Sequence, residues 1–270
     1  MEQFSPISIN DISLSSFKAA LFFDDTFLST ATCFIYEVDN QNYLVTNLHV
    51  VKGRNPATKK VIASSGAIPN IMKIAFYIEK NGVTAGTTQI VVNLYDNRRN
   101  PLEDKPNWYQ AMPDTLIDIA VIKIELPKEV CFNPINKVYL DYNEHTNIQI
   151  ADPVFVVGYP RGIDVDGLPI WKKASIASEP DIDVGDLPKI LIDTATREGM
   201  SGSPVIYYEK RAVILIDNAD NTLKHSDRFF KFLGVYSGRI LGEDELASQL
   251  GVVWKSTIID KIIENTKTRR

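Results

Sequence analysis

The sequence predicts an all-β protein, built as a sandwich or a barrel. Many short runs rich in β-branched and aromatic residues alternate with turn residues, a spacing typical of antiparallel sheets. Helical periodicity is nearly absent between these runs, which argues against a parallel sheet with crossover helices. With 270 residues, the chain is long enough for one large domain or two small ones around hydrophobic cores.

The predicted strands fall into two groups. The first group comprises 17–23, 31–38, 43–46, 73–79, 89–95 and 117–124. Turn residues at 39–42 indicate a hairpin between the second and third of these strands. The second group comprises 153–157, 171–177, 190–194, 203–208, 212–216 and 232–236. We therefore expect an N-terminal β-unit over 1–140, a polar linker over 141–152 and a C-terminal β-unit over 153–254.

One helix is expected, at the C-terminal end, over residues 255–270. Ser256 is placed to cap it. Four isoleucines follow as an apolar stripe at helical spacing: Ile258, Ile259, Ile262 and Ile263. Stripes of this period usually pack against a protein surface, so we expect the helix to lie on the β-structure.

Composition excludes several functional classes. The net charge of −5 comes without a basic stripe, so we expect no nucleic-acid partner. No apolar run reaches the roughly 18 residues that cross a bilayer, and the first residues lack a secretory pattern, so we expect a cytoplasmic protein without a membrane partner. Cys33 and Cys131 belong to no metal-binding cluster, so no metal or cofactor is expected. Two reduced thiols are favoured, although one bridge between them stays open.

Three short segments carry the residues of a nucleophilic hydrolase. His49 follows a β-run in YLVTNLHVV, Asp118 begins DIAVIKI, and Ser201 lies between glycines in GMSGSPV. A serine nucleophile needs a base that takes its proton and a carboxylate that orients this base. Histidine suits the first task, since an ordinary pKa of about 6.5 lets an imidazole accept and return a proton. The sequence therefore predicts a catalytic triad of these three residues.

The glycines around Ser201 predict a sharp turn at which backbone N–H groups converge. Such a point can hold the oxyanion of a tetrahedral intermediate, where one lost donor costs about 10²–10³ in rate. Each triad residue alone has an ordinary structural explanation, but their order and contexts together favour catalysis. The other two histidines, His145 and His225, lie in polar segments and are interpreted as solvated loop residues.

The chain resembles the trypsin-like peptidases in LVTNLHVV, DIAVIKI, REGMSGSPV and, at 156–162, VVGYPRG. It is most similar to their HtrA-like and glutamyl-endopeptidase-like bacterial branches. The resemblance implies two packed six-stranded antiparallel β-barrels, a chymotrypsin-like arrangement. The N-terminal barrel would carry His49 and Asp118, and the C-terminal barrel would carry Ser201. Backbone N–H groups of Gly199 and Ser201 would form the oxyanion hole.

The resemblance also implies where a substrate binds. The strand that ends near Gly238 would pair with the substrate backbone. The residues that would line the specificity pocket are Ala195, Thr196, Tyr236 and Ser237. Ala195 stands where members that cleave after basic residues place a carboxylate. Because a buried unpaired charge is costly, we expect a small or medium uncharged residue on the acyl side of the cut.

The leading hypothesis is a serine endopeptidase that acts on protein substrates through an acyl-enzyme, with a regulatory or defence role toward a dedicated partner. Two alternatives stay open: a catalytically inactive trypsin-like binding module, and an esterase with the same triad. The intact triad argues against the first, and the predominance of peptidases in the family argues against the second. The long stretches between His49 and Asp118 and at 209–231 are expected to form surface hairpins that shape the cleft.

Overall fold

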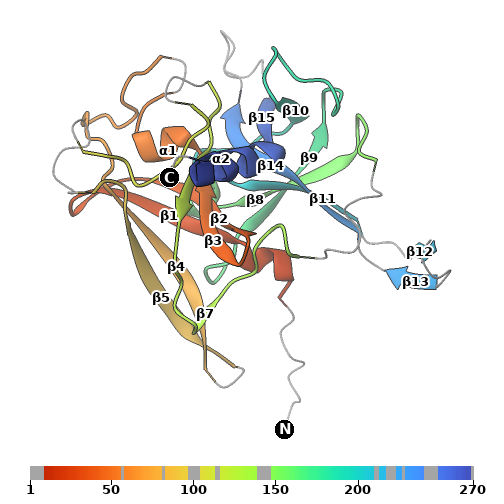
Figure 1. Ribbon diagram of the computed structural model, residues 1–270, viewed down its shortest axis with the longest axis horizontal. Coiled ribbons are helices and arrows are strands. Elements are labelled where there is room, and N and C mark those ends of the chain that lie inside the picture. Colours follow the sequence, from red (N-terminus) through yellow and green to blue (C-terminus); the bar gives the residue numbers. More distant parts are fainter. Residues whose placement is uncertain are drawn as a thin grey trace.

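The computed structural model describes residues 9–55, 58–80, 83–96, 104–112, 116–138, 147–209, 213–216, 223–226, 229–239 and 249–268. Its strands form an open sheet, a closed barrel and a small separate hairpin. Figure 1 shows the sheet and the barrel side by side; within the sheet, the hairpin of β4 (Ile71–Lys80) and β5 (Val83–Asn93) projects beyond the other strands. Residues 141–146 of the expected linker, including His145, lie outside the described residues.

The open sheet has the strand order β5-β4-β1-β2-β3-β6, with β7 paired to β4. Its remaining strands are β1 (Ser16–Phe23), β2 (Thr26–Val38), β3 (Gln41–Thr46), β6 (Ala120–Lys123) and β7 (Val130–Cys131). β2 and β3 are joined through Asp39 and Asn40, which both have positive φ. Left-handed φ at both turn positions is typical of a type I′ hairpin, whose twist matches that of the strands.

The expectation of a closed six-stranded N-terminal barrel is wrong. β5 and β6 are the two edges of the sheet, and they do not pair within the described residues. The segment 106–109 spans the gap through isolated pairs of Pro106 with Tyr95 and of Tyr109 with Val121. Hydrogen bonds from Asp96 to Lys105 and from Asn107 to Leu94 flank the first pair, and Tyr109 and Val121 exchange both bonds in the second. Each pair stays isolated, so the segment forms no strand that joins the two edges. The first sheet therefore stays open.

The second sheet is a closed, six-stranded antiparallel barrel in the order β10-β15-β14-β11-β8-β9, as expected for this half. Its strands are β8 (Pro153–Gly158), β9 (Ile170–Ile176), β10 (Lys189–Asp193), β11 (Pro204–Glu209), β14 (Phe229–Arg239) and β15 (Leu250–Lys255). Of these, β15 was not predicted from the sequence. β12 (Val213–Ile216) and β13 (Leu223–Ser226) pair as a separate hairpin, which places His225 in a strand and not in a loop.

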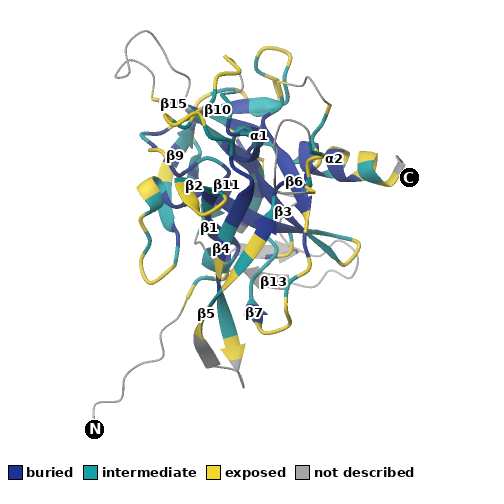
Figure 2. Cartoon of the chain, turned by 90° about the vertical axis from the view of Figure 1, so that its left-hand side faces the viewer, coloured by how far each residue is buried: buried dark blue, intermediate teal, exposed yellow. Residues whose placement is uncertain are grey.

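Three clusters of buried side chains stabilise this arrangement. The first consists mainly of residues of the open sheet, and the second consists mainly of residues of the closed barrel. The third contains residues of both sheets, including Phe34 and Phe232, whose rings pack edge to face with 5.4 Å between their centroids. Figure 2 shows the buried residues gathered along the centre of the strands. Because removal of apolar surface from water drives such packing, the third cluster fixes the two sheets relative to each other.

The C-terminal helix α2 (Thr257–Thr268) covers the third cluster. The whole predicted apolar stripe is buried: Ile258, Ile259, Ile262 and Ile263. Ser256 does not cap the helix through its side chain in the described structure; instead its carbonyl accepts a hydrogen bond from the N–H of Ile259 at 2.9 Å. The hydroxyl of Tyr36 donates to Asp260 at 2.9 Å, which fastens the helix to β2. Short 3-10 turns occupy Asp11–Leu14 and Pro160–Gly162.

Both cysteines are free thiols, as favoured from the sequence. Cys33 is buried on β2, and this burial raises the pKa of its thiol. Within the described chain, no helix is long and apolar enough to cross a membrane. The same residues include no group of three or more His, Cys, Asp or Glu side chains placed to hold a metal ion.

Candidate active site

His49 lies on α1 (Leu48–Lys52), a short helix that follows β3. Its expected β-context therefore ends at Thr46, where the chain leaves the strand. The helix is anchored in the core by the buried side chains around His49: Leu48, Val50 and Val51. Gly53 ends it in the left-handed conformation, with φ of 60°, a common way to terminate a helix. The imidazole is 15% exposed and lines a pocket.

Asp118 lies two residues before β6, and its side chain is only 2% exposed. Its carboxylate accepts hydrogen bonds from the backbone N–H of His49 at 2.8 Å, from His49 Nδ1 at 2.6 Å, and from the hydroxyl of Ser237. A buried carboxylate is costly unless such donors satisfy it. Because an ionised carboxylate only accepts hydrogen bonds, Nδ1 carries a proton, and Nε2 of a neutral ring is free to accept one.

Ser201 lies in a tight turn whose shape requires a glycine at Gly199 and at Gly202. Gly199 has φ of 89°, and Gly202 has φ of 85°. A Cβ at Gly199 would lie 2.3 Å from the carbonyl oxygen of Tyr159, and one at Gly202 would lie 2.1 Å from that of Thr32. Both distances are far below van der Waals contact, so the glycines on either side of the serine are required by packing as well as by φ.

Two backbone N–H groups beside the serine have no acceptor within the described residues: those of Gly199 and Ser201. The carbonyl of Glu198 accepts a hydrogen bond from the N–H of Arg161 at 2.6 Å. In a trans peptide the C=O and the following N–H point in opposite directions, so the Gly199 N–H points away from Arg161. Unpaired, preoriented donors of this kind are what an oxyanion site needs.

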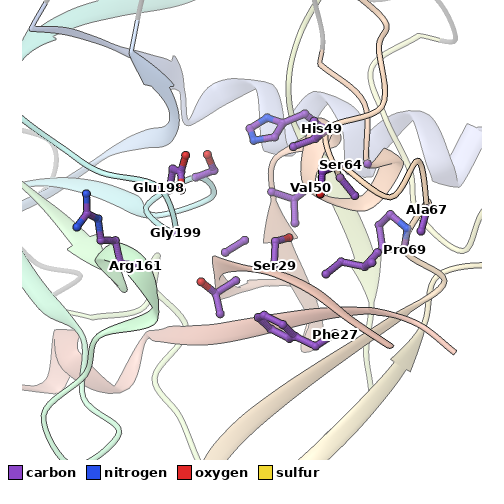
Figure 3. A pocket seen from close by; sticks show the side chains of 17 residues that line it. Phe27, Ser29, His49, Val50, Ser64, Ala67, Pro69, Arg161, Glu198 and Gly199 are labelled. Atoms are coloured by element: carbon purple, nitrogen blue, oxygen red, sulfur yellow. The ribbon is translucent and has the colours of Figure 1, made fainter. Parts of the chain in front are cut away.

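His49, Gly199 and Ser201 line one pocket of about 770 Å³. Figure 3 shows His49 at one end of this pocket, Phe27 at the other, and Arg161 with Glu198 along one side. Within the described structure, His49 is hydrogen-bonded to Asp118 but not to the Ser201 hydroxyl. Hydrogen bonds between base and nucleophile commonly tighten only when substrate binds. The three predicted catalytic residues thus meet at one site, with the histidine–aspartate pair already formed.

Ser237 makes a contact that was not predicted. The resemblance puts this residue in the specificity pocket, and in the structure its hydroxyl donates to Oδ2 of Asp118. It is therefore a third donor to the carboxylate that orients His49. The two residues are 119 positions apart in the sequence, and no local pattern around either one indicates the contact.

Two of the other residues expected in the specificity pocket, Thr196 and Tyr236, are in contact with each other. Thr196 and Tyr236 are each 1% exposed, and their hydroxyls are hydrogen-bonded to each other. The ring of Tyr236 packs against Gly251, where an added Cβ would lie 2.6 Å from Cε2 of the ring. Ala195 and Gly238 are partly buried, and Gly238 lies near the end of β14.

Thr32, which belongs to none of the sequence motifs, contacts the turn before the serine. Its side chain is fully buried; Oγ1 donates to the carbonyl of Gly199 at 2.8 Å and accepts from the N–H of Tyr159 at 3.1 Å. Its backbone N–H donates to the carbonyl of Ser201 at 2.9 Å. One residue of β2 therefore holds the backbone at both Gly199 and Ser201.

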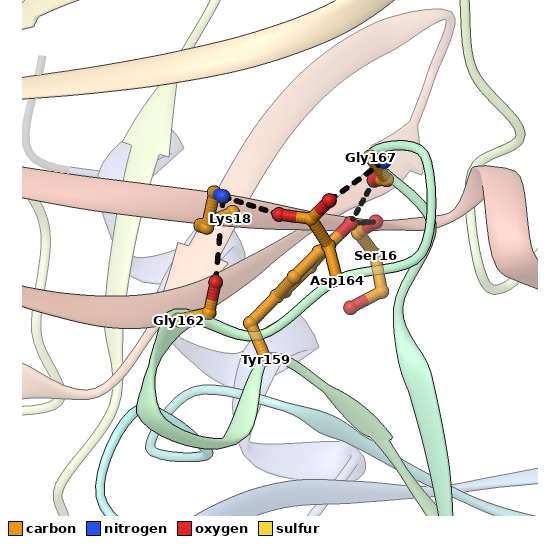
Figure 4. A network of polar contacts seen from close by, with 6 residues as sticks. All are labelled: Ser16, Lys18, Tyr159, Gly162, Asp164 and Gly167. Atoms are coloured by element: carbon orange, nitrogen blue, oxygen red, sulfur yellow. Dashed lines mark hydrogen bonds and ion pairs between the residues drawn. The ribbon is translucent and has the colours of Figure 1, made fainter.

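The turn after β8, which contacts Gly199, is fastened to β1. Lys18 forms an ion pair with Asp164 and lies 3.4 Å from the carbonyl oxygen of Gly162, to which it donates (Figure 4). The hydrogen bond from Lys18 lowers the pKa of the Asp164 carboxyl. Asp164 also accepts from the N–H of Gly167 at 2.8 Å, so the carboxylate closes the turn as well as pairing with β1.

Comparison with known proteins gives one family and a set of similar folds. The model of the family described as "Trypsin-like peptidase domain" matches residues 31–214. No curated protein sequence matches the chain significantly. The serine endoprotease from Yersinia pestis is similar in fold, with a TM-score of 0.50 and 14% identity over 96% of this chain and 67% of its own. An inactive form of Rv3671c from M. tuberculosis gives 0.46 and 18%, over 94% and 86% of the respective chains.

Proposed function

The chain belongs to the trypsin-like peptidase family, and we propose that it is a serine endopeptidase that hydrolyses peptide bonds of protein substrates. One observation carries the proposal: His49, Gly199 and Ser201 line the same pocket, while Asp118 holds the imidazole at 2.6 Å. This is the set of groups that acyl transfer requires, namely nucleophile, base, orienting carboxylate and oxyanion donors.

In the proposed mechanism, Nε2 of His49 takes the proton of the Ser201 hydroxyl while Oγ attacks the substrate carbonyl carbon. Asp118 stabilises the imidazolium that forms, because its carboxylate already contacts Nδ1. The carbonyl oxygen becomes negative and receives hydrogen bonds from the N–H groups of Gly199 and Ser201. His49 then gives its proton to the leaving amine, and the C–N bond breaks. Water, activated by the same histidine, hydrolyses the acyl-enzyme that remains.

On the acyl side of the cut, the proposed preference is a small or medium uncharged side chain. The hydroxyl pair of Thr196 and Tyr236 supports it, because both residues are uncharged and already buried. Ala195 adds no charge that could pair with a lysine or arginine head group. Burial of such an unpaired charge costs several kcal/mol, on the order of the stability lost when one partner of a buried ion pair is removed. Gly238 would hydrogen-bond the substrate backbone in this pose.

We also propose a cytoplasmic protease with a regulatory or defence role toward a particular partner protein. The free thiols of Cys33 and Cys131 support a reducing compartment, since extracellular proteins of this size often carry disulfides. The choice of partner protein would then depend on the residues that surround the catalytic groups.

A serine-directed fluorophosphonate probe tests the proposed activity. The probe should label the wild-type chain and the variant Ser175→Ala, whose partly buried serine lies on β9 outside the pocket, but not Ser201→Ala. Casein should be degraded by the same two labelled proteins. Labelling with turnover of a simple ester alone would indicate an esterase. A folded wild-type chain that is not labelled would indicate an inactive binding module.

A further inference from the structure

We propose that the pocket beside Ser201 binds an apolar side chain on the leaving-group side of the substrate, in the segment released with a new N-terminus. The inference rests on the proposed endopeptidase function and names the substrate class that this side of the site selects. Its basis is the position of the pocket, the side chains of its wall, and the contacts that hold this wall in place.

The position of the pocket assigns it to the leaving group. Ser237 and Gly238, near the end of the strand expected to hold the acyl side, do not line it. His49, which gives its proton to the leaving amine, does line it, together with Ser201. The pocket continues from there over the start of β2, Gly53 and the segment 62–69. A peptide whose scissile carbonyl lies at Ser201 would therefore send its released end into this pocket.

An apolar wall of the pocket is formed by Phe27, Ile62, Ala67 and Pro69, while Val50 lies beside His49 (Figure 3). The polar residues Ser29, Thr30 and Ser64 also line the pocket. Phe27 and Ile62 are 56% and 54% exposed, although both are large and apolar. Exposed apolar side chains that gather beside a reactive group are typical of a binding surface. Figure 3 places Phe27 across the pocket from His49, so a side chain that enters from the catalytic end meets this wall.

The charged residues of the pocket do not favour a charged ligand. Arg161 and Glu198 both line it, one of each sign, and both are exposed. A charged substrate side chain would be attracted by one and repelled by the other, and it would lose hydration against the apolar wall. An apolar side chain has no such cost and removes Phe27 and Ile62 from water. At about 770 Å³, the pocket has room for a leucine or phenylalanine side chain with the neighbouring backbone.

The wall is fixed before substrate arrives. The N–H of Ile62 donates to the carbonyl of Gly53 at 2.9 Å, which ties the segment to the end of α1. Pro69 packs closely on the same glycine, where an added Cβ would lie 2.5 Å from the proline Cδ. A preformed wall loses little conformational entropy when a substrate side chain binds to it. Contact with the wall can therefore contribute to the choice between substrate side chains.

Partitioning of the acyl-enzyme between nucleophiles tests this pocket alone. A nitrophenyl ester with one constant acyl group forms the acyl-enzyme, and added amino-acid amides compete with water for it. Relative to water, leucinamide and phenylalaninamide should react roughly 10- to 100-fold faster than glycinamide or lysinamide, the range that apolar contacts in a pocket supply. Ile62→Ser should lower this preference about tenfold. Ile182→Ser, at a 64% exposed isoleucine outside the pocket, should leave it unchanged.

The outcomes of this experiment distinguish a failure of the inference from a failure of the proposed function. If the acyl-enzyme forms but reacts equally with all amides, or best with lysinamide or an aspartic acid amide, the inference is wrong while the proposed function stands. An equal loss of preference in Ile62→Ser and Ile182→Ser would also overturn it, because the wall would then have no special part. If no acyl-enzyme forms, the proposed function itself fails, and this inference fails with it.

Discussion

Replacement of Thr32 by valine should reduce both the stability and the turnover of this protein. Valine matches threonine in shape, so the packing of β2 is retained and only the hydroxyl is lost. The carbonyl of Gly199 then loses its donor at 2.8 Å, and the N–H of Tyr159 loses its acceptor at 3.1 Å. A buried polar group left unpaired costs about 1–3 kcal/mol, so the free energy of unfolding should fall by roughly 2–6 kcal/mol.

The effect on turnover follows from the position of the lost hydrogen bond. Without Thr32 Oγ1, the peptide of Gly199 is held less firmly, and its N–H is one of the two unpaired donors beside Ser201. Complete loss of one oxyanion donor costs about 10²–10³ in kcat, so a misplaced donor should cost roughly 10- to 100-fold. KM should change little, because these donors act mainly on the transition state.

Two measurements and one control variant separate these effects. Urea denaturation gives the change in stability, and peptide hydrolysis below the unfolding temperature gives kcat and KM separately. Thr32→Ser keeps the hydroxyl and should retain kcat within about threefold of the wild type. A Thr32→Val protein that is destabilised but turns over at the wild-type rate would refute the positioning role. So would a Thr32→Ser variant that loses as much activity as Thr32→Val.

Three further predictions follow from the same contacts. Ser237→Ala removes one donor to Asp118, worth about 1 kcal/mol, so kcat should fall roughly fivefold; an unchanged kcat would show that the contact is only structural. The Lys18–Asp164 pair lowers the carboxyl pKa from 3.8, so its stabilisation is present above pH 4 and is lost as the pH falls through the folded-state pKa. The difference in unfolding free energy between wild type and Lys18→Met should therefore shrink in acid, and a difference independent of pH would contradict this reasoning. Activity should survive EDTA because the proposed mechanism uses only side chains and backbone N–H groups; loss that zinc restores would contradict the mechanism.

Local patterns predicted much of the fold and of the site. Alternating apolar runs located most strands, and the isoleucine stripe located α2. The glycines around Ser201 predicted a turn, and Gly199 and Gly202 both have the positive φ that such a turn needs. Closure of the first sheet was predicted wrongly, because it depends on whether the segment 106–109 pairs as a continuous strand with both edges, which no strand pattern indicates.

The contacts that hold the site were not predicted, because they join residues far apart in the sequence. Thr32 and Gly199 are separated by 167 positions, and Lys18 and Asp164 by 146. Periodicity describes which face of a strand a residue occupies, but it does not say which distant loop lies opposite. The same limit explains why the contact between Ser237 and Asp118 was not predicted.

The alternation along β2 explains how one strand serves both sheets. Ala31, Cys33 and Ile35 point into the core of the open sheet, whereas Phe34 and Tyr36 belong to the cluster shared with the barrel. Since side chains alternate along a strand, Thr32 lies on the same face as Phe34 and Tyr36, toward the barrel. A polar residue on that apolar face is costly unless the other sheet supplies a partner, and the turn before Ser201 does so. The hydroxyl therefore couples the catalytic turn to the packing between the sheets, so a change that shifts this packing should also shift the oxyanion donors.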